Sequence, residues 1–290
     1  MSVEQRDDYT GYLTTGHEWN GITELNTPVP RPVYAFLAAA FVFAVGYWIL
    51  MPAWPTGTSY TKGLLGIDQR DIVRQSLEQA AAARSVWTSQ IAQKPFAEVA
   101  ADPRLMTYVR LTGHRLFADN CAACHGRDAK GGRGFPNLTT MSRLWGGTPE
   151  SIAETIRVGI NSAHPDSRVS QMPAFGHDGI IPAADIPKLS AYLRSLSEPS
   201  VQTKPADIDA GKALFATNCV ACQGEHAEGN SDMGAPNLTD RYWIYGGDPE
   251  TILTTLWAGR QGHMPTWESR LSTLDRKILS LYVVDLRTKP

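Results

Sequence analysis

One uninterrupted apolar stretch stands apart from the rest of this chain. No charged side chain occurs from residue 33 to residue 54, which is long enough for a helix to cross a bilayer. Aromatic residues mark both ends, with Tyr34 at one and Trp54 at the other, as in interfacial belts. The polar segment that precedes the stretch, residues 1–32, disfavours a cleaved signal peptide. The pattern therefore predicts one membrane-spanning helix over residues 33–54.

Beyond that stretch, the apolar positions recur with the period of an α-helix. They predict a spacer over residues 55–101, with a helix from Asp68, its N-cap, to about Gln93. Two further domains are expected over residues 102–198 and 206–290. Each should open on a helix and close on one, the closing helices covering residues 184–196 and 273–286. Few alternating β-branched runs occur, so the predicted fold class is all-α.

The two later domains share one order of motifs. Gly113 and Phe117 in the first correspond to Gly211 and Phe215 in the second. The other echoes are Pro136-Asn137-Leu138-Thr139 with Pro236-Asn237-Leu238-Thr239, Gly146-Gly147 with Gly246-Gly247, and Met172-Pro173 with Met264-Pro265. A shared register of this length indicates two homologous repeats in tandem.

All four cysteines lie in these repeats, as two C-x-x-C pairs. The first pair, Cys121 and Cys124, is followed by His125, which completes the attachment signature of a c-type haem. The thiols add to the haem vinyl groups, and the histidine becomes an axial ligand of the iron. The second pair, Cys219 and Cys222, is followed by Gln223. Because of the repeat, two covalently bound haem c groups are predicted.

Three other uses of the cysteines compete with haem. A zinc site usually spaces its two C-x-x-C pairs about 15–20 residues apart, much closer than here. A redox C-x-x-C would require a βαβ context, which the pattern lacks. Two disulfides would suit an oxidising compartment but would leave His125 and the paired Met-Pro loops unexplained.

The opposite axial ligand must come from a distant loop, and Met172 is the first candidate for the iron beside His125. Pro173 has a fixed φ and would stiffen the loop that presents the sulfur. Met264 holds the equivalent place for the second iron. The competitors are Met141, His164 and His177 in the first repeat and Met233 in the second. For any single methionine, core packing is the usual role.

Gln223 occupies the position of the expected proximal histidine, and an amide oxygen is a poor iron ligand compared with imidazole. Four outcomes are open. The haem attaches with Met264 as its one strong protein ligand; His226 or His263 substitutes; the haem does not attach; or the glutamine is a sequence variant, one base change from histidine.

Charge and compartment narrow the setting. A net charge of −2 and a pI near 6.4 leave no basic footprint for nucleic acid. Positive charges flank the apolar stretch almost evenly, with Arg31 on one side and Lys62 and Arg70 on the other. Bacterial c-type haem is installed outside the cytoplasm, so a bacterial inner-membrane protein is expected, with a cytoplasmic N-terminus and periplasmic haem domains.

The segment from Gly16 to Pro28, which contains His17-Glu18-Trp19-Asn20-Gly21-Ile22, resembles the N-terminal signature of subunit III of the cbb3-type cytochrome c oxidases. Asn20 stands where that family usually has Asp. The loops around Met172-Pro173 and Met264-Pro265 are also similar to those of the family, and the likeness covers nearly the whole chain.

The resemblance implies a membrane helix followed by two tandem cytochrome c domains, in a non-catalytic electron-transfer subunit of an oxidoreductase complex. Electrons would pass from a periplasmic cytochrome c, directly or beside a monohaem cytochrome subunit, to a haem–copper catalytic subunit that reduces oxygen to water. His17 and Trp19 become candidates for docking against a partner subunit within the lipid membrane.

Two other functions compete with this one. A membrane-anchored dihaem cytochrome could serve another respiratory complex. A dihaem enzyme would need an open iron site, which Gln223 would favour at the second haem. Co-purification with a copper-containing, haem b membrane protein distinguishes the oxidase subunit from both.

Overall fold

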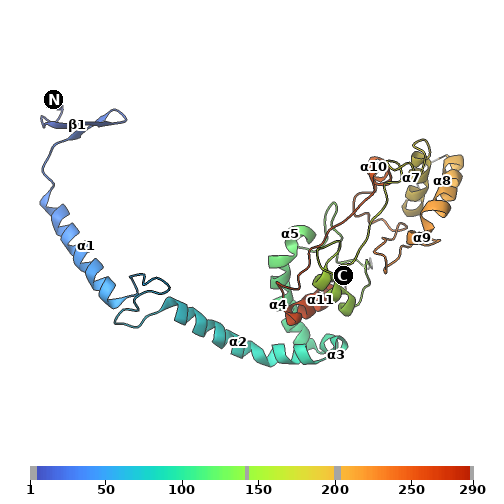
Figure 1. The fold of residues 1–290 in the computed structure, drawn as a ribbon, viewed down its shortest axis with the longest axis horizontal. Coiled ribbons are helices and arrows are strands. Elements are labelled where there is room, and N and C mark those ends of the chain that lie inside the picture. Colours follow the sequence, from blue (N-terminus) through green and yellow to red (C-terminus); the bar gives the residue numbers. More distant parts are fainter. Residues whose placement is uncertain (1–4, 141–143, 199–203, 288–290) are drawn as a thin grey trace. The chain divides into compact units, whose positions relative to one another are not determined.

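The computed structural model describes residues 5–140, 144–198 and 204–287 of the chain. Figure 1 shows the elements in chain order. The chain divides into two compact units, residues 1–83 and 84–290. The first holds a small hairpin and the apolar helix. The second holds both repeats, which therefore form one compact unit.

The N-terminal unit begins with an antiparallel hairpin of β1 (Thr14–Trp19) and β2 (Ile22–Leu25). Its turn is Asn20-Gly21, and both residues have positive φ, 50° and 84°. An Asn-Gly pair favours this two-residue turn because both residues tolerate the left-handed region. The hairpin adds a β element that the apolar periodicity did not predict, although the Asn-Gly pair is a signal for it.

Helix α1 (Arg31–Leu50) is the expected apolar helix. It starts after Pro30 with Pro32 in its first turn, where a missing N–H leaves no hydrogen bond unmade. It ends at Leu50, ahead of Pro52, because the residue before a proline disfavours helical geometry. Within the part of the chain that the structure describes, it is the one helix long and apolar enough to cross a membrane, and none of its residues is buried.

Helix α2 (Gln69–Gln93) confirms Asp68 as an N-cap. The Asp68 carboxylate accepts hydrogen bonds from the Arg70 N–H at 2.9 Å and from the Tyr60 hydroxyl at 2.9 Å. The Tyr60 bond is the main reason why the pKa of Asp68 lies below its usual value. Most of the helix is exposed, and its one buried residue is Ile91, near its end.

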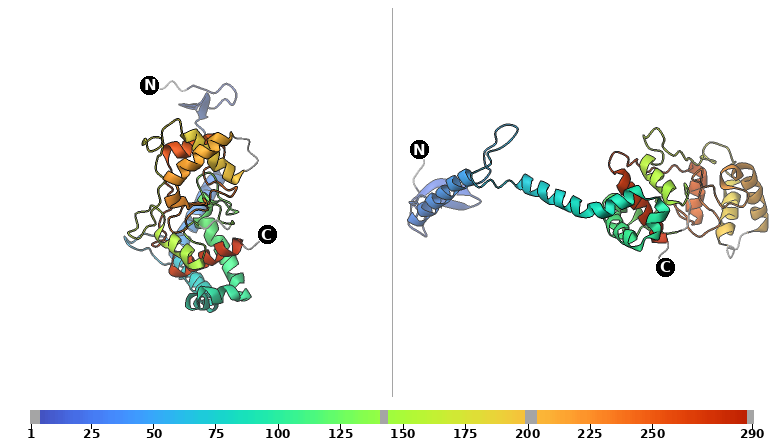
Figure 2. Two further views of the ribbon diagram at one scale, coloured as in Figure 1. Left: turned by 90° about the vertical axis from the view of Figure 1, so that its right-hand side faces the viewer. Right: turned by 90° about the horizontal axis from the view of Figure 1, so that it is seen from below.

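After the short helix α3 (Phe96–Ala101), the two repeats use the same series of helices (Figure 2). The first comprises α4 (Pro103–Asn120), α5 (Ala122–His125), α6 (Pro149–Val158) and α7 (Ile186–Ser197). The second comprises α8 (Pro205–Asn218), α9 (Val220–Gln223), α10 (Pro249–Ala258) and α11 (Thr273–Arg287). The expected helical plan of each repeat is therefore present.

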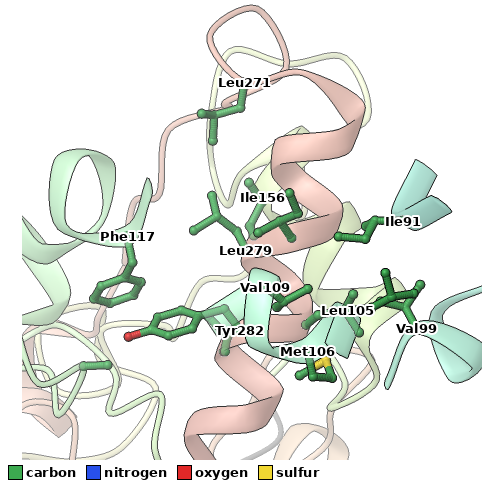
Figure 3. Packing of buried hydrophobic residues seen from close by; sticks show 14 residues of the cluster. Ile91, Val99, Leu105, Met106, Val109, Phe117, Ile156, Leu271, Leu279 and Tyr282 are labelled. Atoms are coloured by element: carbon green, nitrogen blue, oxygen red, sulfur yellow. The ribbon is translucent and has the colours of Figure 1, made fainter. Parts of the chain in front are cut away.

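The packing does not follow the sequence order of the repeats. The closing helix of the chain, α11, packs against α4 and α6 of the first repeat. Figure 3 shows Leu279 and Tyr282 of α11 in one cluster with Phe117 and Ile156. The closing helix of the first repeat, α7, packs against α8 and α10 of the second. The segments 102–198 and 206–290 are repeats of sequence, but each hydrophobic core contains helices from both.

The physical reason is that both repeats carry the same helix-crossing contact. Gly113 on α4 lies directly against the Tyr282 side chain on α11, where a Cβ atom would be only 2.6 Å from that of Tyr282. Gly211 on α8 lies in the same way against Lys188 and Tyr192 on α7. Each closing helix therefore carries a tyrosine that packs against a glycine of an opening helix. This contact is kept although each closing helix packs on the other repeat.

Polar bonds hold α11 on the first repeat. Arg110 on α4 donates to the buried Asp285 carboxylate through Nε at 2.9 Å and Nη2 at 2.7 Å. Arg287 donates to the carbonyls of Leu138 and Gly147, each at 3.2 Å. A buried carboxylate is stable only with such partners, so these bonds fix α11 on the first repeat.

The crossing generates a stability prediction. Gly113→Ala forces a methyl group against Tyr282 and should lower the free energy of unfolding by about 1–3 kcal/mol. Gly132→Ala is the matched control, because nothing lies within 4 Å of its added Cβ. Urea denaturation of the purified chain, followed by circular dichroism, measures both. Equal midpoints for the two variants would contradict the tight crossing.

Candidate haem sites

The first thiol pair lies where α4 meets α5. Cys121 caps the end of α4 and is half-buried, whereas Cys124 is exposed on α5. Burial, and to a smaller degree the nearby Cys124, raises the pKa of the Cys121 thiol to about 11. Cys219, at the junction of α8 and α9, has its pKa raised to about 11 for the same reasons, with Cys222 beside it. The first cysteines of the two pairs, Cys121 and Cys219, therefore have matching surroundings.

His125 is oriented by a backbone carbonyl. Its Nδ1 lies 3.2 Å from the carbonyl oxygen of Pro136, which can only accept, so Nδ1–H is the donor. This bond fixes the tautomer and leaves the lone pair of Nε2 for a metal. Burial lowers the pKa of His125, so the neutral, ligating form is favoured. The Pro136-Asn137-Leu138 motif thus supports the ligand as well as marking the repeat.

The backbone hydrogen bonds around Gln223 are equivalent to those around His125. The N–H of Gly131 donates to the His125 carbonyl at 2.8 Å, and that of Gly229 to the Gln223 carbonyl at 3.0 Å. The next pair of loop bonds repeats as well, Leu138 to Ala129 and Leu238 to Ala227, both at 2.8 Å. Gln223 therefore takes the backbone position of a proximal ligand.

The methionines enter the sites in exchanged order. Met264 packs against the core that contains Cys121, and Met172 packs against the core that contains Cys219. Met264 therefore shares a hydrophobic cluster with Cys121, and Met172 shares one with Cys219. The linear repeat predicts other pairs of iron ligands, His125 with Met172 and the Gln223 side with Met264.

Two backbone bridges fix this exchange. Met264 and Ile160 exchange N–H···O bonds of 2.9 Å each, and Met172 pairs with Arg260 through bonds of 2.8 and 3.2 Å. Beside the bridges stand Gly159 and Gly259, with φ of 73° and 68°. A Cβ at either glycine would overlap the main chain of the opposite methionine loop. Each methionine loop is therefore seated on the other repeat, immediately after its middle helix.

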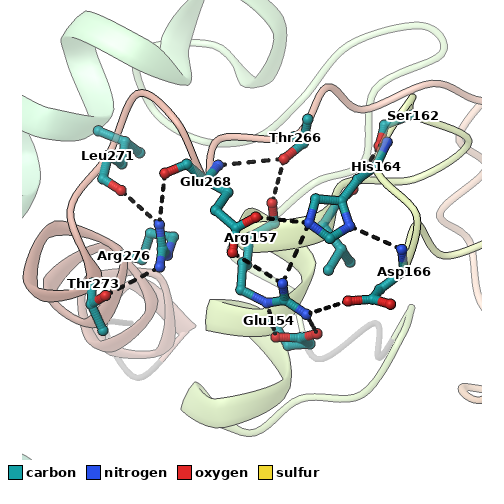
Figure 4. A network of polar contacts seen from close by, with 11 residues as sticks. Glu154, Arg157, Ser162, His164, Asp166, Thr266, Glu268, Leu271, Thr273 and Arg276 are labelled. Carbon is teal, nitrogen blue, oxygen red and sulfur yellow. Dashed lines mark hydrogen bonds and ion pairs between the residues drawn. The ribbon is translucent and has the colours of Figure 1, made fainter.

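A polar network anchors the Met264 loop on α6 (Figure 4). Arg157 of α6 donates to Glu154 at 2.8 Å, to Asp166 at 3.1 Å and to Glu268 at 3.1 Å. His164 Nε2 lies 2.8 Å from Glu268, and the Thr266 hydroxyl donates to the Arg157 carbonyl at 2.6 Å. The paired cation lowers the pKa of Glu154, and His164 followed by Arg157 lowers that of Glu268. The sequence marked only His164, as a possible iron ligand, and its bond to Glu268 could not be predicted because the two residues are 104 positions apart.

The other candidate ligands have different surroundings. His164 belongs to the network just described. His177 is exposed and bonded to Asp178, His263 bonds to the Asn161 carbonyl through Nδ1, and His226 and Met233 are exposed. Met141 lies outside the described residues.

The residues present fit a covalent haem at the first site, which combines two thiols, an oriented imidazole and a thioether. At the second site the thiols and a thioether are present, and the side-chain Oε1 of Gln223 is buried with no hydrogen-bond partner among the described residues. Such an unpaired buried oxygen is costly unless another group completes it. All four thiols are free of disulfides. No cluster of three or more His, Cys, Asp or Glu suited to a metal ion occurs in the described ranges.

Paired thiol motifs on two repeated helical frames, behind an apolar helix, define a membrane-anchored c-type cytochrome with two haem-binding domains. Comparisons with known families make this specific. Residues 11–58 match the model described as the N-terminal domain of cytochrome oxidase-cbb3, FixP. Residues 111–197 match cytochrome c, and residues 206–283 match cytochrome c oxidase, cbb3-type, subunit III.

Relatives match along almost the whole chain. The cbb3-type cytochrome c oxidase subunit FixP of Bradyrhizobium sp. (strain ORS 278) is 45% identical over 97% of this chain and 96% of the relative. The corresponding subunit CcoP of Azospirillum brasilense is 38% identical over 99% of both. The chain therefore belongs to the FixP/CcoP family of cbb3-type cytochrome c oxidase subunits and is an electron-transfer subunit with two cytochrome c domains.

The network generates a prediction about the Met264 loop. Arg157→Met removes the cation that joins Glu154, Asp166 and Glu268, and should weaken the seating of this loop by roughly 1 kcal/mol. Hydrogen exchange at the amides of Met264 and Trp267, which bond to α6 or the residues after it, should then rise by about fivefold.

The Met172 amide is the internal control, because it bonds to Arg260 in the other repeat. The exposed Arg104→Met is the matched control variant. An equal rise at all three amides would contradict a network specific to the Met264 loop.

Proposed function

We propose that this subunit carries two covalent haem c groups, at Cys121/Cys124 and Cys219/Cys222, and relays electrons through them. The proposal rests on one observation: equivalent backbone hydrogen bonds surround His125 and Gln223, and each residue follows an equivalent pair of thiols. Electrons would come from a cytochrome c, directly or beside a monohaem cytochrome subunit. They would leave to a haem–copper catalytic subunit that reduces oxygen to water.

The axial ligands follow the exchanged packing. His125 and Met264 would hold the iron of the first haem, and Met172 would approach the iron of the second on the face opposite Gln223. This proposal rests on the cores in which the two methionines lie and on the bridges at Ile160 and Arg260. A thioether opposite imidazole raises the potential of a haem, which suits an acceptor of electrons from another cytochrome.

When bound, the haems supply one-electron transfer, and the protein binds and orients them. His125 keeps Nε2 unprotonated through the Pro136 bond. The Met264 loop bonds to the backbone of Ile160 in the first repeat, and the Met172 loop bonds to that of Arg260 in the second. The two proposed sites therefore belong to one packed body. These backbone bonds would hold the two methionines in place beside bound haems.

We also propose that the N-terminal segment is cytoplasmic and that the spacer and both repeats are periplasmic. Covalent attachment at C-x-x-C takes place outside the bacterial cytoplasm, and α1 supplies a span of sufficient length. The exposed hairpin with Trp19 would then meet its partner subunit or the lipid headgroups on the cytoplasmic side.

The exchanged ligation is tested in a chain that keeps one haem. Cys219→Ala with Cys222→Ala leaves attachment at Cys121 and Cys124 alone. In that background, Met264→Ala should abolish the methionine-to-iron charge-transfer band and lower the haem potential, because the soft sulfur ligand is lost. Met172→Ala is the matched control and should retain the band. Loss of the band in Met172→Ala alone would contradict the exchange and support the linear pairing.

The orientation is tested by adding protease to spheroplasts. The repeats should be digested while an epitope placed before β1 survives, because only the periplasmic side is exposed. Digestion of the epitope with survival of both haem domains would contradict the proposed topology.

A further inference from the structure

The two repeats differ in one chemically decisive residue. His125 and Gln223 end equivalent single-turn helices, α5 and α9, and are followed by glycines with almost the same φ, 76° at Gly126 and 74° at Gly224. Their carbonyls accept equivalent loop bonds. An imidazole and a primary amide therefore occupy corresponding positions beside the two thiol pairs.

The side-chain amide of Gln223 lacks a hydrogen bond that its burial would require. Gln223 Oε1 is buried and has no donor among the described residues, whereas the His125 ring is held by Pro136. A buried carbonyl oxygen without a partner is destabilising, so a group that completes it is expected in the loaded protein. A haem iron held at the adjacent thiols, Cys219 and Cys222, would be such a group.

An amide oxygen is a hard and weak donor, and it binds haem iron far less tightly than imidazole nitrogen. The ligand expected on the opposite face is the Met172 thioether, which is also neutral. A haem iron between a weak oxygen donor and a thioether would be largely high-spin, and the oxygen would be the more easily displaced of the two donors.

The structure offers no histidine in place of Gln223. His226 is exposed and faces solvent rather than the core. His263 lies beside Met264 and bonds through Nδ1 to the Asn161 carbonyl of the first repeat. His177 is exposed and paired with Asp178. Among the described residues, these are the histidines that compete for the second iron.

We propose that the second haem has an exchangeable axial position on the Gln223 side, which takes a small neutral nitrogen donor of the imidazole class. The nitrogen donor would take the place of the weak amide oxygen of Gln223, with no electron or proton transferred. The inference rests on the proposed attachment of haem at Cys219 and Cys222. It gives this subunit a ligand-binding site in addition to its electron-transfer role.

The test uses the full chain, purified alone in detergent so that no other haem protein contributes. A pyridine haemochrome assay first counts the haems, with two expected per chain. Imidazole is then titrated into the oxidised protein and followed by optical absorption and electron paramagnetic resonance. About half of the haem should be high-spin at the start and should become low-spin as imidazole binds.

Two variants sharpen the result. Gln223→His supplies the imidazole from the protein, so the high-spin signal should be absent and the titration flat. His125→Gln is the mirror variant and should make the first haem respond as well. His226→Ala should behave as the unmodified chain, because His226 is not a ligand.

The outcomes are distinguishable. Two haems that are both low-spin and indifferent to imidazole would overturn the inference and leave the relay intact. Equal titrations of the unmodified chain and Gln223→His would overturn the role of Gln223. A His226→Ala variant that alone becomes high-spin would show that His226 ligates the iron and would also overturn it. One haem per chain would contradict the proposed attachment at the second pair, and the inference with it.

Discussion

The contact of a glycine on an opening helix with a tyrosine on a closing helix is the interaction on which the rest of the haem-binding unit depends. Gly113 receives Tyr282, and Gly211 receives Tyr192, so each core closes with a helix from the other repeat. The aromatic neighbours match as well, since Tyr282 lies 6.0 Å from Phe117 and Tyr192 lies 5.6 Å from Phe215, centroid to centroid. Because the two helix crossings are chemically alike, each core keeps its glycine–tyrosine contact when its closing helix comes from the other repeat. Polar groups then secure the arrangement, with Asp285 holding Arg110 across α11 and α4.

This exchange determines what the haem sites contain. Met264 packs against the same cluster as Cys121, and Met172 packs against the same cluster as Cys219, so each methionine lies on the core that holds a cysteine of the other repeat. Gly159 and Gly259 permit the close backbone approach, and the Arg157 network secures the Met264 loop further. With the proposed ligands, each haem site would need residues of both repeats. Both cytochrome c domains thereby belong to one packed body, and the loss of one closing helix would affect the core of the opposite repeat.

Much of this organisation could be predicted from the sequence, because it is recorded locally. The uncharged stretch predicted α1, and the spacing of apolar residues predicted α2 and the opening and closing helices of the repeats, though not the middle helices α6 and α10. The paired motifs predicted the repeats and located the thiols. His125 was evident from its position after Cys124. The pairing of methionines with thiols was not, because motif order does not say which of two equivalent closing helices occupies which core. The hairpin before α1 was not predicted, because a two-residue turn leaves no trace in the helical periodicity. The Asn20-Gly21 pair is the signal that could have indicated it. Gln223 was visible in the sequence, but the unpaired buried Oε1 is a property of the folded chain.

The central claim is that Met264 serves the haem at Cys121 and Cys124, and that Met172 serves the haem at Cys219 and Cys222. A density map of the haem-loaded subunit at side-chain resolution measures this most directly, because it shows which sulfur adjoins which iron. We predict continuous density from the Met264 sulfur to the iron that His125 ligates. Density from the Met172 sulfur to that same iron would contradict the exchange of closing helices.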